Sequence, residues 1–525
     1  MKLARILSRA TVGVAAPEVF VEVHLGGGLP RMSVVGLPET AVKESRDRVK
    51  AALETSGFEV PQRLVTISLA PAELPKEGGG FDLPIALGIL VASEQLKPRH
   101  LDSTEFIGEL SLGGDLRPVR GVLPSAIRAT AAGRALVVPE VNQQEAGLVR
   151  NGRHLFANSL RQVTDWLNND RPLPPVVSRL ALTASDELDL ADVVGQLQAR
   201  RALEIAAAGG HHLLMIGPPG TGKTMLAARL PGILPPMTEA EALESAAVAS
   251  ISHHGLDLRQ WRRRPFRAPH HTASGVALVG GGSRPRPGEI SLAHNGVLFL
   301  DELPEFSRPV LEVLREPIES GRIVISRAAR QSEFPARFQL VCAMNPCPCG
   351  HASDSRGHCH CSADQVQRYR QRISGPLLDR IDLQVEVQRP GLSVIHAEAQ
   401  RGEASAAVLA RVTAARERQL ARNGLPNGQM EVADTRRFCV LPEAARRLLE
   451  AAAAHWSLSP RACHRIMRVT RTIADLDGED EVEASHVAEA IALRCTFSRP
   501  TQAGAAPTLA HCIAAPSENG KLIAP

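Results

Sequence analysis

The sequence predicts an α/β fold in which a parallel-sheet core lies between an α+β domain and a helical domain. Three observations predict it. Short apolar runs of strand length at 211–217, 296–302 and 338–345 alternate with helical segments, as buried parallel strands do. The first 165 or so residues mix strand-like alternation with Gly-rich turns. After about residue 395, long Ala-, Leu-, Arg- and Glu-rich segments are interrupted by single Pro and Gly residues, which is typical of helices.

Length and composition limit the possibilities further. With 525 residues, the chain is expected to form three or four domains at about 150 residues each. The 60 Lys+Arg against 56 Asp+Glu leave a net charge of +4, which is too small to indicate nucleic-acid binding. With 44% apolar and 22% charged residues, the composition excludes a disordered or collagen-like chain. Because aromatics are only 3%, few rings are available to stack on bases.

No segment resembles a membrane span or a secretory signal. The longest apolar candidate, 81–93, contains Asp82 and Pro84 and is shorter than the roughly 18 residues that a span needs. Arg5 and Arg9 interrupt the N-terminus before an apolar stretch of signal-peptide length. A cytoplasmic protein without a membrane partner is therefore expected. Nine cysteines in a chain of this length do not indicate a disulfide scaffold.

Changes in pattern along the chain mark the expected domains. The first domain is expected to contain paired strands within 19–38, a helix over 40–58, a strand over 63–71 and a buried helix over 81–93. The predicted divisions are an N-terminal domain at 1–167, a Pro-rich polar linker at 168–187, the core at 188–394, a helical domain at 395–498, and a tail at 499–525 that is expected to be poorly ordered.

A Gly-rich loop that ends in Lys-Thr follows the first strand of the core. It fits the phosphate-loop pattern in full, with a strand before it and a helix after it. Its glycines let backbone N–H groups approach phosphates, and the helix N-terminus adds a positive dipole end. We expect Lys223 to contact the β- and γ-phosphates of ATP and Thr224 to hold Mg²⁺. The loop comprises Gly217, Pro218, Pro219, Gly220, Thr221, Gly222, Lys223 and Thr224.

Polar residues follow the next two predicted strands. Asp301 and Glu302 end the strand at 297–300. Asp301 is expected in the Mg²⁺ shell, and Glu302 is expected to orient and deprotonate the attacking water. A strand that ends in acids is commonplace alone, but its position after a phosphate loop favours this function. Asn345 ends the third strand and is expected beside Asp301, where it would position the water or sense the γ-phosphate; by itself this is a weak signal.

Three long stretches, 265–306, 314–350 and 458–476, carry a resemblance to a known family. The order of motifs resembles the AAA+ ATPases, and these stretches are similar to the Mg-chelatase-like branch, specifically the ComM/YifB family. The resemblance covers nearly the whole chain. It implies an ATP-hydrolysing ring, expected to be a hexamer, with a helical lid. It also implies a DNA motor, because this family is associated with branch migration during the integration of transforming DNA.

The resemblance also implies roles for single residues. Arg380 matches the arginine finger that reaches the ATP of a neighbouring subunit, where a fixed positive fork stabilises transition-state charge. An ordinary ion pair with Asp379 or Asp382 is the alternative that side-chain chemistry alone favours. The other implied positions are Arg461 as the sensor-2 arginine of the lid, and Val194 and Gly195 beside the adenine.

Two inserted segments resemble hairpins of this branch. The segment 321–336 resembles the hairpin that projects into the ring channel, and Arg327 and Arg330 at its tip are expected to contact the DNA backbone. The segment 266–289 resembles the insert in the second AAA+ helix and holds further arginines; solvated loop charge is the alternative for both. The His pairs at 253–254 and 270–271 lack the helical spacing of metal ligands, so we expect loop structure there.

Two cysteine pairs lie just after Asn345. Cys-x-Cys pairs in polar, Gly-containing sequence are unsuited to a hydrophobic core and suit a metal-binding loop. A structural Zn²⁺ held by four thiolates is therefore predicted. The spacing is tighter than the usual C-x₂-C, a nearby histidine could replace one ligand, and four free thiols are the alternative. The four predicted ligands are Cys347, Cys349, Cys359 and Cys361.

The segment 69–85 resembles the active-site segment of Lon-type proteases. Its Gly-rich turn at 78–82 carries no Ser, so Ser-Lys catalysis has no nucleophile there. A Lon-protease-like fold without peptidase activity is therefore predicted, acting as a DNA-binding or ring-stabilising collar. Two other functions remain open at this stage: the motor subunit of a magnesium chelatase, and an ATP-dependent protease or remodeller.

Overall fold

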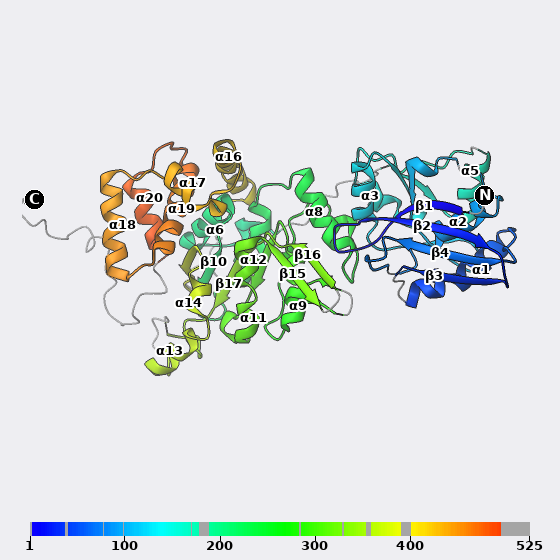
Figure 1. The fold of residues 1–525 in the computed structure, drawn as a ribbon. Coiled ribbons are helices and arrows are strands. Elements are labelled where there is room, and N and C mark those ends of the chain that lie inside the picture. Colours follow the sequence, from blue (N-terminus) through cyan, green and yellow to red (C-terminus); the bar gives the residue numbers. More distant parts are fainter. Residues whose placement is uncertain are drawn as a thin grey trace, which may run out of the picture.

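A computed structural model shows three packed regions in chain order, from an α+β region at the N-terminus to a helical region near the C-terminus (Figure 1). The parallel-sheet core lies between them in Figure 1. The structure describes residues 3–36, 40–76, 78–97, 99–169, 171–177, 188–282, 285–327, 330–352, 359–389 and 401–494. Among these residues, no helix is long and apolar enough to cross a membrane.

The N-terminal region is built on a seven-stranded mixed sheet of order β3-β4-β2-β1-β5-β8-β9. Apolar and polar residues alternate along β2, so its valines are buried on one face. Its strands are β1 (Leu3–Arg9), β2 (Glu18–Gly26), β3 (Arg31–Val35), β4 (Leu64–Ala70), β5 (Thr104–Phe106), β8 (Ala135–Pro139) and β9 (Leu155–Ala157), with a separate β6 (Glu109–Leu110) and β7 (Leu116–Arg117) pair. Its helices are α1 (Thr40–Thr55), α2 (Asp82–Ala92), α3 (Val122–Ala131), α4 (Gln143–Ala146) and α5 (Leu160–Asn169).

The elements expected within the first 93 residues are confirmed, with one correction. The sequence predicted that the two strands within 19–38 pair with each other. Instead, β4 lies between them, antiparallel to β2 and parallel to β3. The helix α1 connects β3 to β4, which is the crossover that a parallel pair requires. Helix α2 is buried along its whole length, as expected for an apolar run.

The core has five parallel strands in the order β11-β14-β17-β10-β18. The three central strands are buried at every residue, which confirms the predicted parallel strands. The strands are β10 (Leu213–Ile216), β11 (Phe266–Arg267), β14 (Val297–Leu300), β17 (Gln339–Met344) and β18 (Leu383–Glu386). The helices of this region that precede β11 are α6 (Leu197–Gly209), α7 (Lys223–Arg229) and α8 (Glu239–Ser250).

Shorter elements decorate the core. Two hairpins, β12 (Gly280–Gly281) with β13 (Arg286–Pro287) and β15 (Arg322–Arg327) with β16 (Arg330–Pro335), lie outside the main sheet. Short helices are α9 (Gly275–Val279), α10 (Glu289–Leu292), α11 (Arg308–Glu312), α12 (Arg315–Ser320), α13 (Ala363–Arg370) and α14 (Gly375–Leu378). Short 3₁₀ helices occur in all three regions: η1 (Leu101–Ser103) and η2 (Glu140–Asn142) in the N-terminal region, η3 (Leu190–Asp192), η4 (Leu230–Ile233), η5 (Leu258–Gln260) and η6 (Leu303–Glu305) in the core, and η7 (Asn427–Gln429) among the C-terminal helices.

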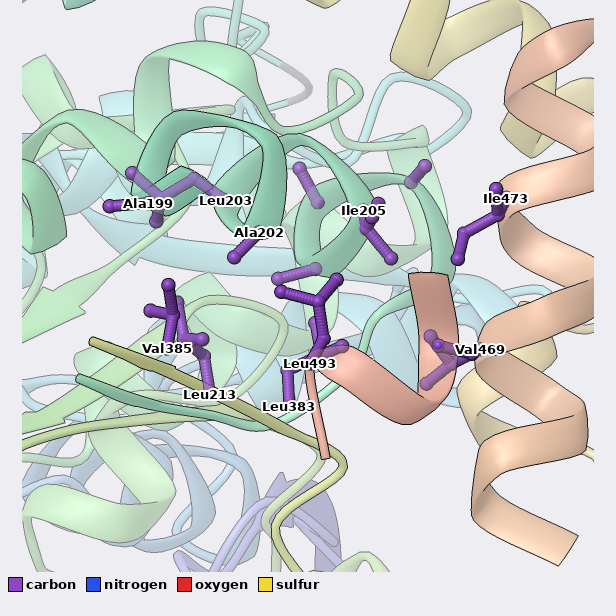
Figure 2. Close-up of a cluster of buried hydrophobic side chains, with 14 of the residues drawn as sticks. Ala199, Ala202, Leu203, Ile205, Leu213, Leu383, Val385, Val469, Ile473 and Leu493 are labelled. Carbon is purple, nitrogen blue, oxygen red and sulfur yellow. The ribbon is translucent and has the colours of Figure 1, made fainter. Parts of the chain in front are cut away.

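The C-terminal helices share one hydrophobic cluster with the core sheet. Side chains of α6, the strands β10 and β18, and α19 point toward one another in Figure 2. Leu203, Leu213 and Ile473 are each fully buried there. This packing joins the C-terminal helices to α6 and the core sheet. The helices are α16 (Ser405–Asn423), α17 (Val432–Phe438), α18 (Glu443–Trp456), α19 (Pro460–Asp477) and α20 (Ala484–Ala492).

The N-terminal region packs on α8 of the core. Leu123 and Leu148 share a buried cluster with Met237 and Trp261 from the core. The hydroxyl of buried Ser250 donates a hydrogen bond to the carboxylate of Glu145 across this boundary. Burial raises the pKa of Glu145, whose partners are hydrogen-bond donors. The N-terminal region is thus fixed to α8 of the core.

Candidate functional site

The Gly-rich loop connects β10 to α7 and has the compact path that phosphate binding requires. A Cβ at Gly217 would come within 2.2 Å of the Val387 carbonyl oxygen, so only glycine fits there. Gly220 and Gly222 have φ of +75° and +90°, which side chains disfavour. The Thr221 hydroxyl donates to the Pro218 carbonyl at 3.0 Å and closes the turn. The eight predicted loop residues therefore form one continuous turn at the N-terminus of α7.

Lys223 lies inside this turn. Its Nζ donates to the carbonyl oxygens of Gly217 and Pro218 at 2.7 and 2.9 Å and to Asn345 Oδ1 at 3.2 Å. Burial lowers the pKa of Lys223, and the charges of Asp301 and Glu302 oppose that effect. The ammonium group is thus held in place with its donors satisfied, where a phosphate oxygen can exchange for a carbonyl.

Thr224 and Asp301 meet across the site. Thr224 Oγ1 donates to Asp301 Oδ2 at 2.7 Å, and the other oxygen of Asp301 accepts from the Glu302 backbone N–H at 2.9 Å. Hydroxyl and carboxylate oxygens are the ligands that Mg²⁺ prefers beside nucleotide phosphates. The residues present therefore fit the predicted Mg²⁺, with Thr224 and Asp301 as its protein ligands.

Glu302 follows in a left-handed backbone conformation with φ of +51°, which is uncommon for a residue with a side chain. His271 Nδ1 lies 3.2 Å from Glu302 Oε2. The His271 ring contacts Phe306 edge-on, with the ring centroids 6.5 Å apart, and packs on the His270 ring at 4.1 Å. The sequence did not single out His271 as a partner of Glu302.

Asn345 completes the group because β14 and β17 are neighbours in the sheet. Leu300 pairs with Cys342, so the carboxyl ends of both strands reach the same edge. The structure thereby brings Lys223, Thr224, Asp301, Glu302 and Asn345 together, although they are up to 122 residues apart. The Asn345 side-chain oxygen accepts its hydrogen bond from Lys223 rather than from a group beside Asp301.

Arg380 is buried beside α12. One guanidinium nitrogen lies 2.7 Å from Glu319 Oε1, and another donates to the Pro376 carbonyl at 2.7 Å. Arg380 does form an ion pair, as the alternative held, but its partner is Glu319 and not Asp379 or Asp382. Asp382 instead binds Arg465 at 2.6 Å. Asp379 instead lies 3.9 Å from Arg494. Both partners of Arg380 belong to α12 and α14 rather than to the phosphate loop.

Arg461 lies in the first turn of α19, where it is exposed and has no hydrogen-bond or ion-pair partner among the described residues. Arg465, one turn further along, donates to the Arg380 carbonyl at 3.0 Å as well as to Asp382. The helix that carries Arg461 is therefore attached to the loop that carries Arg380.

The predicted adenine-side segment lies against the phosphate loop. Val194 is half-buried and Gly195 is exposed with φ of +71°. The next residue, Gln196, donates from Nε2 to the Gln388 carbonyl at 2.6 Å and to the Thr221 carbonyl at 3.4 Å. Gln196 thus links this segment to the loop, a contact that the sequence did not predict.

Four cysteine sulfurs converge just beyond Asn345. The Sγ atoms of Cys347, Cys349, Cys359 and Cys361 all lie within 4.8 Å of one another. Cys347 Sγ is 3.3 Å from Cys349 Sγ and 3.8 Å from Cys359 Sγ. Within the described ranges, this is the one group of metal-ligating side chains that converges.

The predicted DNA-contacting hairpin forms as expected. β15 and β16 pair from Arg322 with Pro335 to Arg327 with Arg330, so the last two lie at the turn end. The side chains of Arg327 and Arg330 lie outside the described residues. In the other insert, Arg284 also lies outside them. Arg267 there pairs with Glu289 at 2.7 Å, which makes it a structural residue.

The Gly-rich turn of the N-terminal region has no nucleophile among its described residues. Asp82 is fully buried and accepts from Arg48 at 2.8 and 3.1 Å. Burial raises the pKa of Asp82, and the Arg48 hydrogen bond opposes that effect. Lys76 is also fully buried, donates to the Pro71 carbonyl, and has its pKa lowered by burial. The Asp82–Arg48 pair holds the turn against α1, and Lys76 binds the segment that follows β4.

The fold and this site define a nucleotide-binding protein of the AAA+ class with a helical lid, for which ATP and Mg²⁺ are the implied ligands. Residues 189–394 match the family model of magnesium chelatase subunit ChlI, residues 402–494 match its C-terminal part, and residues 21–142 match a further ChlI model. The matches over 189–394 and 402–494 cover the parallel-sheet core and the C-terminal helices, respectively.

The chain is 51% identical to competence protein ComM of Haemophilus influenzae and covers 98% of it with 94% of its own length. It is 49% identical to YifB of Salmonella typhimurium, covering 97% of that protein with 94% of its own length. The magnesium-chelatase 38 kDa subunit of Cereibacter sphaeroides is 26% identical over 38% of this chain and 58% of its own. The chain therefore belongs to the ComM/YifB family of Mg-chelatase-like AAA+ proteins.

Proposed function

We propose that this protein is an ATP-hydrolysing, ring-forming DNA motor, a branch-migration helicase that promotes integration of DNA during natural transformation or recombination. The single observation that carries the proposal is the near-complete alignment with a protein named for competence, on a chain whose ATP-site residues converge. Its place of action is the cytoplasm, where the DNA is.

In the proposed cycle, Lys223 binds the β- and γ-phosphates of ATP and the loop N–H groups hold the remaining phosphate oxygens. Thr224 and Asp301 would hold Mg²⁺, which would supply positive charge beside the phosphates. Glu302 orients the attacking water and accepts its proton. Asn345, within hydrogen-bond distance of Lys223, positions the γ-phosphate end of the site.

Hydrolysis is shared between subunits of a hexameric ring. Arg380 leaves Glu319 and reaches the γ-phosphate of the neighbouring subunit, where its charge stabilises the transition state. Arg461 acts from the lid, and its helix is attached to the Arg380 loop through Arg465. The β15–β16 hairpins line the channel, and Arg327 and Arg330 contact DNA phosphates.

Two alternative functions receive less support. A magnesium-chelatase motor subunit shares the family models, but the related 38 kDa subunit aligns with only 38% of this chain. An ATP-dependent protease needs a nucleophile that the turn at 78–82 lacks. We assign the N-terminal region, with its predicted Lon-protease-like fold, to a DNA-binding or ring-stabilising collar.

We also propose a structural Zn²⁺ at the four cysteines. A tetrahedral site with Zn–S distances of about 2.3 Å places its sulfurs roughly 3.8 Å apart. The closest sulfur pairs measure 3.3, 3.7 and 3.8 Å, so the four thiolates fit such an ion. Zinc bound there would cross-link the two ends of the segment 347–361.

The function is tested with purified full-length protein, a model Holliday junction and ATP. We expect DNA to stimulate ATP hydrolysis and ATP to drive movement of the junction. The variant Glu302→Gln should bind ATP and DNA but move no junction. Full junction movement by that variant would contradict the mechanism, and junction-independent insertion of Mg²⁺ into a porphyrin by the wild type would favour the chelatase alternative.

A further inference from the structure

The loop that carries the four cysteines lies directly against the ATP site. Gly350 is buried in this loop with φ of +84°. A Cβ on Gly350 would come within 2.7 Å of Pro219 Cδ in the phosphate loop and 3.9 Å of Asn345 Cγ. The cysteine loop therefore touches two parts of the nucleotide site at one glycine.

The cysteine loop begins two residues after Asn345 in the chain. Only Pro346 separates Asn345 from Cys347, which is fully buried. The Gly350 N–H donates to the Cys347 carbonyl at 3.0 Å and closes the turn 347–350. Since Asn345 Oδ1 accepts from Lys223, the position of Cys347 is linked to Lys223 through one peptide segment and one hydrogen bond.

The far end of the cysteine loop is anchored by a helix. Ser362, immediately after Cys361, caps α13 with a reciprocal capping box that involves Gln365. The Tyr369 ring of α13 is buried, and burial together with the charge of Glu305 raises the pKa of Tyr369 to about 12, while a hydrogen bond with the Asn345 backbone opposes the rise. Helix α13 therefore packs back toward Asn345.

From this arrangement we propose that the four-cysteine metal site braces the ATP pocket, by holding Gly350 against Pro219 and fixing Asn345 beside Lys223. The inference rests on the zinc site proposed above. A metal bound by the four thiolates would cross-link the two described parts of the cysteine loop, residues 347–352 and 359–361. Loss of the metal would release both contacts at once and weaken nucleotide binding without touching a phosphate ligand.

The first test measures metal and nucleotide binding separately on full-length protein purified without added metal. Zinc content is measured by mass spectrometry, and affinity is measured with a fluorescent non-hydrolysable ATP analogue. We expect one zinc per chain in the wild type and in the control Cys463→Ser, which alters a half-buried thiol outside the cluster. The double variant Cys359→Ser/Cys361→Ser should lose zinc and bind the analogue about tenfold more weakly.

A second pair of variants separates the contact from the metal and does not depend on folding of the double variant. Gly350→Ala keeps all four thiols but pushes a methyl group into Pro219. The control Gly424→Ala has a similar φ of +73° with nothing within 4 Å of its added Cβ, so it carries the backbone strain alone. We expect Gly350→Ala to retain zinc and weaken analogue binding about tenfold, and Gly424→Ala to change neither.

The outcomes are distinguishable. Absence of stoichiometric zinc from the wild type would overturn the metal site and the inference, and would leave the ATP-driven motor intact. Zinc in the wild type with unchanged nucleotide affinity in both the double cysteine variant and Gly350→Ala would overturn the brace alone. Weakened affinity in Gly424→Ala equal to that of Gly350→Ala would assign the effect to backbone strain and also overturn it.

Discussion

His271 Nδ1 lies 3.2 Å from Glu302 Oε2, so a histidine of the inserted loop holds the carboxylate that is assigned to activate water. The contact links the segments that follow two neighbouring parallel strands, since His271 follows β11 and Glu302 follows β14. Along the chain, His271 lies between α8, which binds the N-terminal region, and the β12–β13 hairpin.

We predict that His271→Ala raises ATP hydrolysis in the absence of DNA and reduces the stimulation by DNA. The physical reason is that the histidine occupies one oxygen of the carboxylate that must accept the proton of water. The measurement is the ATP turnover rate with and without a junction. His254→Ala, which changes an exposed histidine between α8 and β11, is the control and should behave as wild type. A fall in hydrolysis under both conditions would instead make His271 a residue that positions Glu302 productively.

Lys223→Ala is expected to abolish nucleotide binding. Lys223 is the buried cation that meets the phosphates, and its removal leaves the Gly217 and Pro218 carbonyl oxygens facing phosphate oxygens. Equilibrium binding of a fluorescent ATP analogue checks this, with circular dichroism as the control for folding. Tight binding by the variant would contradict the assignment of the phosphate loop.

Thr224→Ala and Asp301→Asn are expected to weaken the dependence of nucleotide binding on Mg²⁺. Their side chains meet at 2.7 Å and supply the proposed oxygen ligands, so each change removes or weakens one ligand. Titration of the analogue at several Mg²⁺ concentrations gives the apparent metal affinity. Unchanged Mg²⁺ dependence in both variants would place the ion elsewhere.

Arg380→Ala should bind ATP normally but lose about 10³-fold in hydrolysis, the amount that arginine fingers contribute. Because the finger acts on a neighbouring subunit, mixing Arg380→Ala with the equally inactive Lys223→Ala should restore part of the activity. At mixed interfaces an intact phosphate loop from one subunit then meets an intact arginine from the other. Mixtures that stay inactive, although they form rings, would indicate that Arg380 serves its own subunit through Glu319.

Glu145 should make the joint between the N-terminal region and the core sensitive to pH. Burial raises its pKa in the folded protein, so the folded state binds a proton more readily than the unfolded state does. The ordinary pKa of a Glu carboxyl is 4.5. The free energy of unfolding should therefore decrease as the pH rises from this value through the higher pKa that Glu145 has in the folded protein. Thermal unfolding between about pH 4.5 and pH 7 should show a shallower decrease for Glu145→Gln than for the wild type. Identical slopes would show that this carboxyl does not contribute to the pH dependence.

Several features of this protein follow from local sequence. The Gly-rich loop, the apolar strands before Gly217, Asp301 and Asn345, and the buried α2 are contiguous patterns, and the structure forms each of them. Such patterns are readable because backbone conformation and strand burial depend mainly on nearby residues. The order of strands could not be read in this way. The insertion of β4 between β2 and β3 depends on a crossover that brings together residues far apart in the chain.

The sequence by itself determined the family of this protein, its phosphate loop and the acids that follow, because these are runs of adjacent residues. Only the tertiary structure decided which side chains meet across such runs. It paired His271 with Glu302 and Arg380 with Glu319, and it placed Gly350 on Pro219. The physical reason is that charged and polar side chains select partners by distance in space, which the packing of the sheet and its inserts sets.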